Sequence, residues 1–451
     1  MKLLNYDTER HQKGLALQRQ VISIFEKLVG EFLDMPLAKL PRHGIFHLRS
    51  AVTLEGLQGF VQAHQEEWGS IIEQINKFEG ANSEEVLQRM IEKLNVHVYQ
   101  FDGQILIQLD YSKVIGRWWN LLTENSRGIL FSYPNLEVVS LPFQKFYNAN
   151  ERAETQIHAL NHQQDSYVME KLDGTMIHLF EVNGKLYSST RGSAGEYYFN
   201  DKAMTFVNQA KYNEILHCVK SGYTPIFEIL LKEGDEYGQT VAYTDDDLRL
   251  IAIRHRETGA YVHPMELESI AKSFGLTSAK FYKGKELFHI LSEQETIQNQ
   301  EGWVVYFKNG MMVKVKGEEY LKLNRSQNAE VRLTAHGYLI EQTIYQWMLE
   351  DIADDQLSAI KSDELRKELD MKHERIVQSL EAYITELHSL FKHFYSEDRK
   401  TFALALKADK SIDKATFGLL FEIYKGNTIG IQNITWDVIE NKMINDDLLS
   451  T

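Results

Sequence analysis

The sequence is poor in the groups that mark secreted, membrane-anchored or thiolate-metal proteins. It has one cysteine, Cys218, among 451 residues, so it cannot form an internal disulfide or a cysteine cage for a metal. No apolar run approaches the roughly 20 residues that cross a bilayer, and the stretch from Met1 to Asp7 lacks the apolar core of a secretory signal. We therefore expect a cytoplasmic protein with no membrane partner.

Positive charge is also scarce. The chain carries 49 lysines and arginines against 64 aspartates and glutamates, a net charge of −15. A broad, non-specific nucleic-acid surface needs a basic footprint, so this composition argues against one. Charges further apart than a Debye length of roughly 8 Å are screened from one another. A few lysines that converge in one cleft could therefore still bind phosphate groups.

The length predicts two or three domains, and the hydrophobic pattern divides the chain into three regions. Residues 1–92 have the apolar spacing of helices and form a helical N-terminal extension. This pattern includes Leu15, Val21, Ile22, Phe25 and Leu28, and then, after breaks at Pro36 and Pro41, Leu57, Phe60, Val61 and Trp68. We find no residues in this region that suggest chemistry.

Residues 93–328 have the pattern of strands. Val96–Phe101 and Ile105–Leu109 flank an Asp102-Gly103 turn, which is a strong hairpin signal, and helical inserts are expected near 200–220 and 264–274. Residues 329–451 return to a helical pattern, which includes Leu380, Ile384, Leu387, Leu390 and Phe391. The fold class is therefore α+β, with antiparallel sheets and flanking helices, followed by an all-helical C-terminal domain.

One lysine lies where two predicted strands meet. Lys171 ends the strand-like run from Tyr167, precedes Gly174, and is followed by a second β-branched and aromatic run, Met176–Val182. A lysine drawn out of water in such a crease becomes a nucleophile, because burial disfavours the charged ammonium. The alternative is a surface lysine beside Asp173 in a turn.

An Asn183-Gly184 dipeptide predicts a two-residue hairpin turn after this second strand. The register it implies pairs Val182 with Lys185, Phe180 with Tyr187, and Met176 with Arg191. Arg191 would then return beside Lys171, where it could hold a phosphate or a ribose, and Gly192 would allow close backbone approach. The alternative is a surface arginine at a strand end.

An Asn309-Gly310 dipeptide predicts a second hairpin. Pairing outward from this turn sets Val305 against Lys314, Trp303 against Lys316, and Glu301 against Glu318. Side chains alternate between faces, so one face would carry Glu301, Trp303, Val305, Lys314 and Lys316, and the other Val304, Tyr306, Val313 and Val315. A carboxylate near two lysines suits a divalent metal and the phosphates that it bridges. The alternative is a solvated face with an ion pair.

Two further segments carry isolated polar groups. Glu228 stands in the otherwise apolar strand-like run Tyr223–Leu230, where a carboxylate must be paired or ligated. Arg127 and Lys145 each lie in a short apolar segment, at Ser126–Phe131 and Pro142–Asn148. Each segment alone could be structural.

Taken together, these motifs resemble the covalent nucleotidyltransferase superfamily of polynucleotide ligases and RNA capping enzymes, and most of all the ATP-dependent RNA ligase 1 family of tailed phages. The resemblance covers roughly residues 95 to 430 and is specific in combination. It rests on Arg127-Gly128-Ile129, Lys145-Phe146-Tyr147-Asn148, Lys171-Leu172-Asp173-Gly174 (motif I), Phe227-Glu228 (III), Glu301-Gly302 (IV), Lys314-Val315-Lys316 (V) and Asp398 to Ala403. Arg191 stands where the family often has lysine, Tyr147 where it often has phenylalanine, and the N-terminal extension has no counterpart.

The resemblance implies an RNA ligase that uses ATP and Mg²⁺, or alternatively Mn²⁺. Lys171 would take AMP from ATP and pass it to an RNA 5′-phosphate, and a 3′-hydroxyl would displace AMP to seal the strand. The implied partner is RNA with 5′-phosphate and 3′-hydroxyl ends, with cleaved tRNA as one candidate, and the implied enzyme is a monomer that acts in RNA repair. Lys314 and Lys316 would stabilise the α-phosphate, and Arg127 and Lys145 would reach the β- and γ-phosphates.

The same resemblance implies roles for the remaining residues. Glu301 would bind the metal, Glu228 the ribose or the metal, and Asp173 would orient Lys171 or bind the metal through water. The nucleotide site would be completed by Glu170, Gly174, Arg191 and Tyr147, the last packing near the nucleotide. A DNA ligase or a capping enzyme is the alternative within the superfamily, although those generally carry a β-barrel domain where this chain turns helical. A non-sealing RNA-end binding protein is the alternative outside it.

Overall fold

The computed structural model describes residues 1–33, 45–46, 94–111, 119–160, 166–195, 197–235, 237, 239–321, 338–351, 353, 357, 363–427 and 429–450. The chain divides into two compact units. The first consists of residues 1–22, 99–110 and 120–330, and the second of residues 23–98, 111–119 and 331–451. Residues 1–22 thus cluster with residues 99–110 and 120–330, and the last boundary between the units follows residue 330.

Helix α1 (Thr8–Leu33) confirms the helical pattern at the start of the chain. The second helical stretch expected around Leu57 to Trp68 lies outside the described residues. Within the expected extension, the structure also contains the short strand β1 (Ile45–Phe46), which pairs with β2 (Leu94–Phe101) in an antiparallel register.

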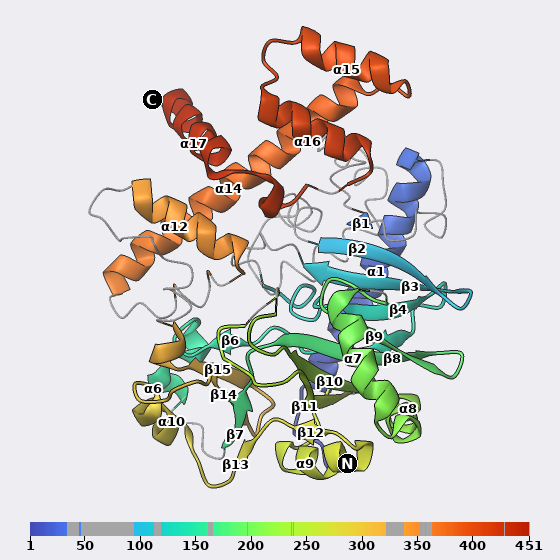
Figure 1. The fold of residues 1–451 in the computed structure, drawn as a ribbon, viewed down its shortest axis with the longest axis vertical. Coiled ribbons are helices and arrows are strands. Elements are labelled where there is room, and N and C mark those ends of the chain that lie inside the picture. The colour runs from blue at the N-terminus through green and yellow to red at the C-terminus, as the bar shows by residue number, and fades with distance from the viewer. Residues whose placement is uncertain are drawn as a thin grey trace. The chain divides into compact units, whose positions relative to one another are not determined.

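The first unit is built mainly from antiparallel strands, as expected (Figure 1). One sheet has the order β12-β11-β10-β8-β9 and a second has the order β13-β7-β14-β15-β6. The strands of the first sheet are β8 (Thr175–Val182), β9 (Lys185–Ser189), β10 (Tyr223–Leu230), β11 (Asp247–His255) and β12 (Thr277–Ser278). Those of the second are β6 (Tyr147–Asn148), β7 (Ser166–Lys171), β13 (Phe281–Tyr282), β14 (Gly302–Phe307) and β15 (Met312–Lys316).

A third sheet has the order β1-β2-β3-β4-β5, with β3 (Gln104–Tyr111), β4 (Ile129–Tyr133) and β5 (Val138–Ser140). The predicted two-residue turn joins β2 to β3, because Asp102 and Gly103 both have positive φ, at 46° and 84°. In this conformation the turn matches the twist of the flanking strands.

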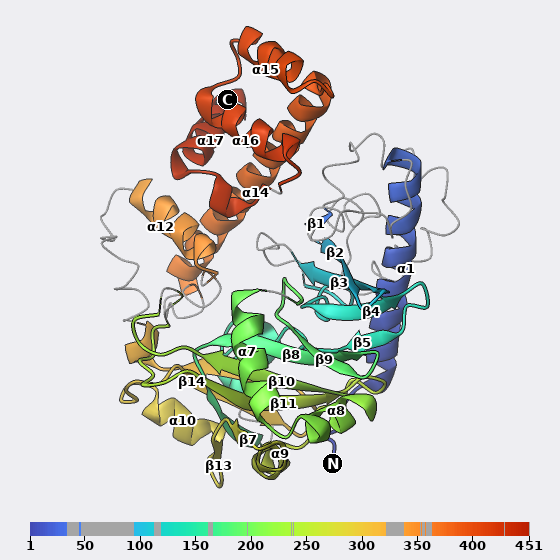
Figure 2. The same cartoon turned by 45° about the vertical axis from the view of Figure 1, so that its right-hand side comes forward.

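Short helices cover the sheets of the first unit. They are α6 (Ile157–Leu160), α7 (Tyr198–Gln209), α8 (Tyr212–Lys220), α9 (Leu267–Phe274) and α10 (Leu287–Glu293), with 3₁₀ turns at Ala153–Thr155 and Pro264–Glu266. Figure 2 shows α7 and α8 lying against the sheet that contains β8 and β10. Ile177, Ile226 and Ile229 of these strands pack with Ile215 and Val219 of α8 in one buried cluster.

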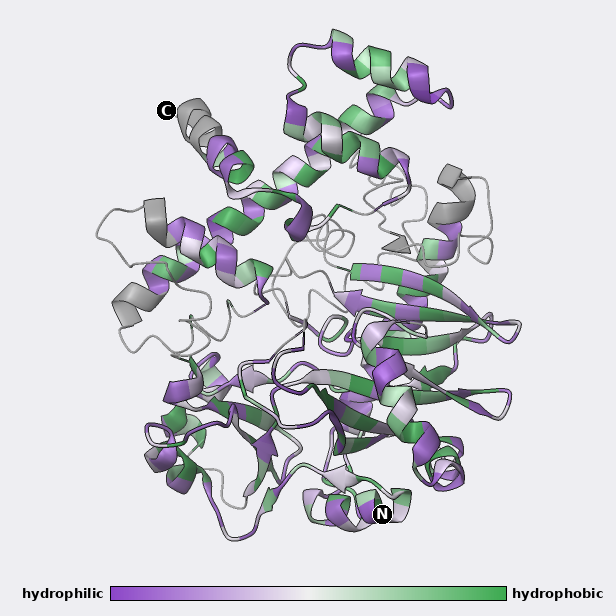
Figure 3. Cartoon of the chain, in the orientation of Figure 1, coloured by the Kyte–Doolittle hydropathy of each residue, from purple (hydrophilic) through white to green (hydrophobic). Residues whose placement is uncertain are grey.

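The second unit confirms the helical C-terminal prediction. Its helices are α12 (Tyr338–Leu349), α14 (Asp363–Phe394), α15 (Arg399–Ala408), α16 (Lys414–Tyr424) and α17 (Trp436–Ser450), with a 3₁₀ turn at Ile431–Asn433. Hydrophobic and hydrophilic residues alternate along them (Figure 3), as amphipathic helices require. Asp398, singled out in the sequence, caps α15 by accepting hydrogen bonds from the backbone and hydroxyl of Thr401 at 2.8 and 2.6 Å. Within the described residues, no helix is both long and apolar enough to cross a membrane.

The first Asn-Gly hairpin has the predicted register near its turn. Asn183 and Gly184 have φ values of 52° and 83°, and β8 pairs with β9 through Val182–Lys185 and Phe180–Tyr187. The predicted Met176–Arg191 pair is wrong, because β9 ends at Ser189, which pairs with His178, and the ladder does not continue to Arg191.

The second Asn-Gly hairpin is out of register with the prediction by one residue. The observed pairs are Gly302–Lys316, Trp303–Val315, Val304–Lys314 and Val305–Val313. Only Gly310 in this turn has positive φ, at 83°, and the backbone of Phe307 bonds to that of Met311. The loop therefore has three residues, a geometry that places glycine at a bulge. Trp303 and Val305 consequently lie in the core with Val313 and Val315, away from the lysines.

Candidate active site

Three residues on adjacent strands form a row across the second sheet. Gly302 of β14 pairs with Lys171 of β7 on one side and with Lys316 of β15 on the other. Residues directly opposite each other in a sheet share a face, so both lysine side chains leave the sheet on the same side. The glycine between them has no side chain and leaves that space open.

The backbone at this position accepts only glycine. Gly302 has a φ of 148°, and a Cβ atom there would lie 2.1 Å from the carbonyl oxygen of Val315 and 2.7 Å from the Cα atom of Lys316. This conformation is strained for any residue with a side chain. It interrupts the alternation of faces at the start of β14, which explains why Glu301 reaches the lysine row although Trp303 lies in the opposite core.

Glu301 occupies the space over the glycine. Its side chain is 4% exposed, and its oxygens lie 2.6 Å from Nζ of Lys171 and 2.9 Å from Nζ of Lys316. Burial acts to raise the pKa of Glu301, but Lys171 and Lys316 outweigh it and hold the pKa below its usual value. One carboxylate thus bridges two lysines, as an anion.

A second carboxyl group faces this cluster from β10. Burial raises the pKa of Glu228 to about 8, with Lys171 opposing the shift and Glu301 and Asp173 adding to it. A Cβ atom on Gly174 would lie 2.5 Å from the carbonyl oxygen of Ile229 and 2.7 Å from Cγ of Glu228. Glycine in the turn after Lys171 therefore lets β10 approach the loop that follows this lysine. Glu228 is mostly protonated at pH 7, since its pKa lies above that pH.

Asp173 fixes the turn that follows Lys171. Its Oδ1 accepts a hydrogen bond from the hydroxyl of Tyr320 at 3.1 Å, its Oδ2 accepts one from the backbone of Val241 at 2.9 Å, and its own backbone N–H donates to the hydroxyl of Tyr243 at 3.1 Å. Burial raises its pKa, and Glu301 adds to that rise. Tyr320 and Tyr243 were not identified from the sequence, because neither lies in a short motif around a charged residue.

Lys314 lies two residues before Lys316 on β15, so its side chain leaves the same face of the strand. It pairs with Val304 on β14 and with Asn148 on β6, and its Nζ lies 5.7 Å from the ring centroid of Phe146. Lys145 is 8% exposed and contacts Glu151 at 3.7 Å. The structure therefore brings the Lys145–Asn148 segment to the strand that carries Lys314 and Lys316.

Tyr147 lies between two cations. Its ring centroid is 5.3 Å from Nζ of Lys145 and 4.8 Å from the guanidinium carbon of Arg152. Burial raises the pKa of its hydroxyl. The ring is thus held by cation–π contacts from both basic side chains.

Arg127 and Arg191 come from segments that pack closely. Gly128 has a φ of 96°, and a Cβ atom there would lie 2.8 Å from the carbonyl oxygen of Arg191. Arg127 donates to the carbonyl oxygen of Gln144 at 3.5 Å, and Arg191 pairs with Asp110 at 3.4 Å. Glu170 lies on the strand face opposite to Lys171, and its carboxylate accepts a hydrogen bond from the backbone of Lys280 at 3.2 Å.

Comparison with known proteins identifies the part of the chain that holds this cluster. Residues 125–320 match the model of a family described as RNA ligase. This segment is therefore similar to RNA ligases. It contains every residue of the cluster described above, from Arg127 to Tyr320.

Two relatives match parts of the chain. A protein of Thermovibrio ammonificans named "Putative RNA ligase" is 31% identical over 185 residues, which is 41% of this chain and 47% of the relative. A protein of Autographa californica nuclear polyhedrosis virus named "Putative bifunctional polynucleotide kinase/RNA ligase" is 25% identical over 273 residues, 54% of this chain and 37% of the relative. The chain thus spans less than half the length of either relative. Among solved structures, an archaeal ATP-dependent RNA ligase has 13% identity and a TM-score of 0.39, over 80% of this chain and 99% of that one.

The carboxylates of residues 125–320 do not form a ready metal cage. Among the described residues, no group of three or more histidine, cysteine, aspartate or glutamate side chains is arranged to hold a metal ion. Both oxygens of Glu301 contact lysines and both oxygens of Asp173 accept hydrogen bonds. Three carboxyl groups nevertheless lie near one another, and the charge of Glu301 helps to raise the pKa values of Glu228 and Asp173. A further cation at this place would reduce that repulsion.

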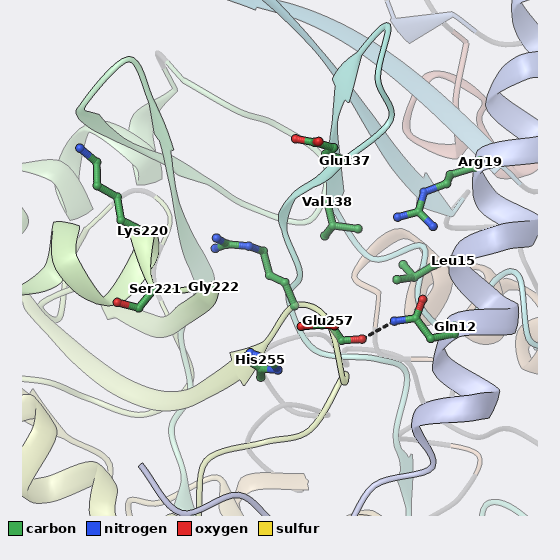
Figure 4. Close-up of a pocket in the computed structure, with 11 residues that line it drawn as sticks. Gln12, Leu15, Arg19, Glu137, Val138, Lys220, Ser221, Gly222, His255 and Glu257 are labelled. Atoms are coloured by element: carbon green, nitrogen blue, oxygen red, sulfur yellow. Dashed lines mark hydrogen bonds between the residues drawn. The ribbon is translucent and has the colours of Figure 1, made fainter.

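A separate cavity of about 560 Å³ lies in the first unit, between α1 and the turn that joins α8 to β10 (Figure 4). Gln12 and Arg19 line it from α1, and Ser221 and Gly222 line it from the turn. Gly222 precedes β10, whereas Glu228 lies toward the other end of that strand. At roughly 3.3 Å per residue, the cavity is well removed from the Glu228 end and is not the site of Lys171.

Proposed function

We propose that this chain is an ATP-dependent RNA ligase in which Lys171 is the nucleophile. The observation that carries the proposal is the bridge of Glu301 between Lys171 and Lys316 within a segment of the RNA ligase family. A surface lysine in a turn is not expected to share a buried carboxylate with a second lysine. A nucleophile and a phosphate-binding lysine are expected to share one, because both must be oriented toward the same phosphate.

In the first proposed step, Nζ of Lys171 loses its proton to solvent water and attacks the α-phosphorus of ATP. The Nζ–phosphorus bond forms, the bond to the bridging oxygen breaks, and pyrophosphate leaves with the electron pair. Lys314 and Lys316 stabilise the charge that develops on the α-phosphate, and Arg127 and Lys145 bind the β- and γ-phosphates. Glu228 binds the ribose, for which a protonated carboxyl group has both a donor and an acceptor.

The second and third steps seal the RNA. An oxygen of the RNA 5′-phosphate attacks the phosphorus of the lysyl-AMP, the phosphorus–nitrogen bond breaks, and the lysine amine regains a proton. A 3′-hydroxyl then attacks the 5′-phosphorus, loses its proton, and AMP leaves. Asp173 holds the nucleophile loop in place through its bonds to Tyr320 and Val241.

A divalent ion, Mg²⁺ or Mn²⁺, is proposed to bind through Glu301 and Asp173. Mg²⁺ usually takes one or two carboxylates together with substrate phosphates, which matches a site without a complete protein cage. When bound, it supplies positive charge to the phosphates of ATP. The roles proposed for Glu170, Gly174, Arg191 and Tyr147 are to shape and line the nucleotide site.

We further propose that the substrates are RNA ends with a 5′-phosphate and a 3′-hydroxyl, among them cleaved tRNA, and that the enzyme acts in RNA repair as a cytoplasmic monomer. The buried Cys218 has a pKa raised by burial to about 12, as suits a thiol that takes no part in chemistry.

The test is a sealing assay with matched substrates. The purified chain with ATP and Mg²⁺ should join 5′-phosphate and 3′-hydroxyl RNA strands, with an RNA-adenylate appearing first. Equal activity with GTP, or a preference for nicked DNA, would favour the alternatives within the superfamily. A protein–AMP adduct without any sealing would favour a non-sealing RNA-end binding protein.

A further inference from the structure

The first residues of the chain extend the sheet that carries Glu228. Leu3 forms an antiparallel bridge with Val262, the backbone N–H of Leu4 donates to the carbonyl oxygen of Tyr261 at 2.8 Å, and that of His263 donates to Lys2 at 2.8 Å. These bonds fix the N-terminal segment, residues 2–12, beside the chain that follows β11.

The start of α1 is anchored on the adjoining turn. His11 contacts the carbonyl oxygen of Arg256 at 3.0 Å, and Gln12 donates to the carbonyl oxygen of Glu257 (Figure 4). Gly259 has a φ of 73°, and a Cβ atom there would lie 2.6 Å from Cγ of His11. The turn thus needs glycine to accept the N-terminal segment. Burial lowers the pKa of His11 to about 4, so it is neutral at pH 7.

Tyr6 connects this anchored segment to the strand-like segment that carries Lys145. Its hydroxyl donates to Oε1 of Gln144 and accepts a hydrogen bond from Nη2 of Arg254 at 2.9 Å. Arg254 is fully buried and also donates to the carbonyl oxygen of Pro142 at 2.7 Å. Residues 142–144 are therefore held by the hydroxyl of Tyr6, from the N-terminal segment, and by the guanidinium of Arg254, from β11.

Arg10 reaches the segment that carries Arg127. Its guanidinium lies 2.8 Å from the carboxylate of Glu124, and the carbonyl oxygen of Glu124 accepts a hydrogen bond from the backbone N–H of Lys145 at 2.7 Å. Arg127 in turn donates to the carbonyl oxygen of Gln144. Residues 124–127 and 142–145 thus hold each other, and Tyr6 and Arg10 hold both.

We propose that the N-terminal segment belongs to the triphosphate site, with Tyr6 and Arg10 as positioning residues that set Arg127 and Lys145 against the β- and γ-phosphates of ATP. This inference rests on the proposed function, which assigns those phosphates to Arg127 and Lys145. It gives a role to a part of the chain in which the sequence pattern revealed no chemistry.

The inference predicts which step depends on the N-terminal segment. Only the attack on ATP, and its reversal by pyrophosphate, involves the β- and γ-phosphates. Sealing of an RNA that is already adenylylated uses Lys171, Lys314 and Lys316 but no triphosphate. If Arg127 and Lys145 are displaced, adenylylation of Lys171 should therefore slow, whereas the sealing of RNA-adenylate should not.

The experiment compares Tyr6→Phe and Arg10→Ala with Lys13→Ala in the full-length chain. Lys13 lies on the same helix and pairs with Glu9 in an exposed contact, so its variant controls for a change on α1. In Tyr6→Phe and Arg10→Ala we expect the KM for ATP in adduct formation to rise about tenfold, the scale of a lost hydrogen bond to a charged group. The rate of sealing preformed RNA-adenylate should stay within about twofold of the parent in both variants. In Lys13→Ala, this rate and the KM for ATP should both stay within about twofold of the parent.

Each result has a distinct meaning. An unchanged KM for ATP in both variants, or an equal loss in adduct formation and in sealing of RNA-adenylate, would overturn the inference, because the segment would then contribute nothing or only stability. Parent protein that forms no adduct would instead overturn the proposed function on which the inference rests. Urea unfolding of each variant separates a loss of position from a loss of folded protein.

Discussion

The amine of Lys171 and the carboxylate of Glu301 lie 2.6 Å apart, and the second oxygen of that carboxylate lies 2.9 Å from Lys316. Glu301 is thus the partner that sets the direction of both lysines. In the proposed mechanism this contact must give way before attack, since the amine of Lys171 has to lose its proton and turn toward phosphorus. The carboxylate of Glu301, once it no longer contacts Lys171, would then be able to bind a divalent cation.

Replacing Glu301 with glutamine should separate charge from hydrogen bonding. Glu301→Gln keeps the size of the side chain but leaves the amine of the nearly buried Lys316 without its counterion, which costs about 3 kcal/mol of unfolding free energy. We expect the rate of protein–AMP formation to fall at least about a hundredfold. Glu257→Gln, at an exposed position away from the cluster, is the control. A Glu301→Gln variant with the parent rate would remove Glu301 from the mechanism.

Gly302 should tolerate no side chain. A Cβ atom at this position meets Val315 at 2.1 Å in a backbone conformation that only glycine adopts readily, so we expect Gly302→Ala to lose about 3 kcal/mol of stability and to form no adduct. Gly103→Ala is the matched control, because Gly103 also has positive φ but its Cβ would meet nothing within 4 Å. Its cost should be about 1 kcal/mol, from backbone strain alone. Thermal unfolding of both variants measures the difference.

The two tyrosines that bind Asp173 should affect rate more than stability. Tyr320→Phe removes a hydrogen bond to the carboxylate and Tyr243→Phe removes one to the backbone N–H, each worth about 1 kcal/mol of stability. If these bonds orient the nucleophile loop, single-turnover adduct formation should slow roughly tenfold in each variant, because small errors of position are costly. Tyr282→Phe, which loses a bond to Gln300, should keep the parent rate. Unchanged rates in both test variants would mean that Asp173 needs neither tyrosine.

Glu228 should make the protein without nucleotide less stable as pH rises. Its pKa is about 8 in the fold against about 4.3 in an unfolded chain, so the folded state binds more protons between these values. Its contribution to stability is therefore full below about pH 4 and is lost as pH rises toward 8. We expect Glu228→Gln to gain on the order of 2 kcal/mol relative to the parent between pH 5 and pH 8.5. Identical pH profiles of urea unfolding would show that the carboxyl group ionises normally.

The sequence predicted the grouping of Glu301 with Lys316 but not the strand register that produces it. The Asn183-Gly184 turn was assigned correctly, since both residues adopt the positive φ that a two-residue turn needs. At Asn309-Gly310 the same dipeptide forms a three-residue loop, in which only the glycine has positive φ. The register therefore slipped by one residue. The predicted grouping of Glu301 with Lys316 is nevertheless found. The unusual φ of Gly302 interrupts the alternation of faces, so the Glu301 side chain lies on the same side as the lysines in spite of the shifted register.

Long-range contacts set the limit of what the sequence could reveal. The partners of Asp173 come from positions 241, 243 and 320, and those of Arg254 from positions 6, 125, 142, 144 and 259. Neither periodicity nor turn chemistry relates such distant positions. For the same reason the sequence did not reveal the bonds of the first residues to Tyr261 and His263, which lie in the same unit.

The central claim is that Lys171 carries AMP, and the most direct measurement is the mass of the modified peptide. The parent chain, incubated with ATP and Mg²⁺ and digested under mildly alkaline conditions, should yield an AMP-bearing peptide whose modified residue is Lys171. Lys171→Ala should yield none, whereas the exposed-loop control Lys283→Ala should be modified like the parent. An AMP adduct on any other residue, or an undiminished adduct in Lys171→Ala, would contradict the account.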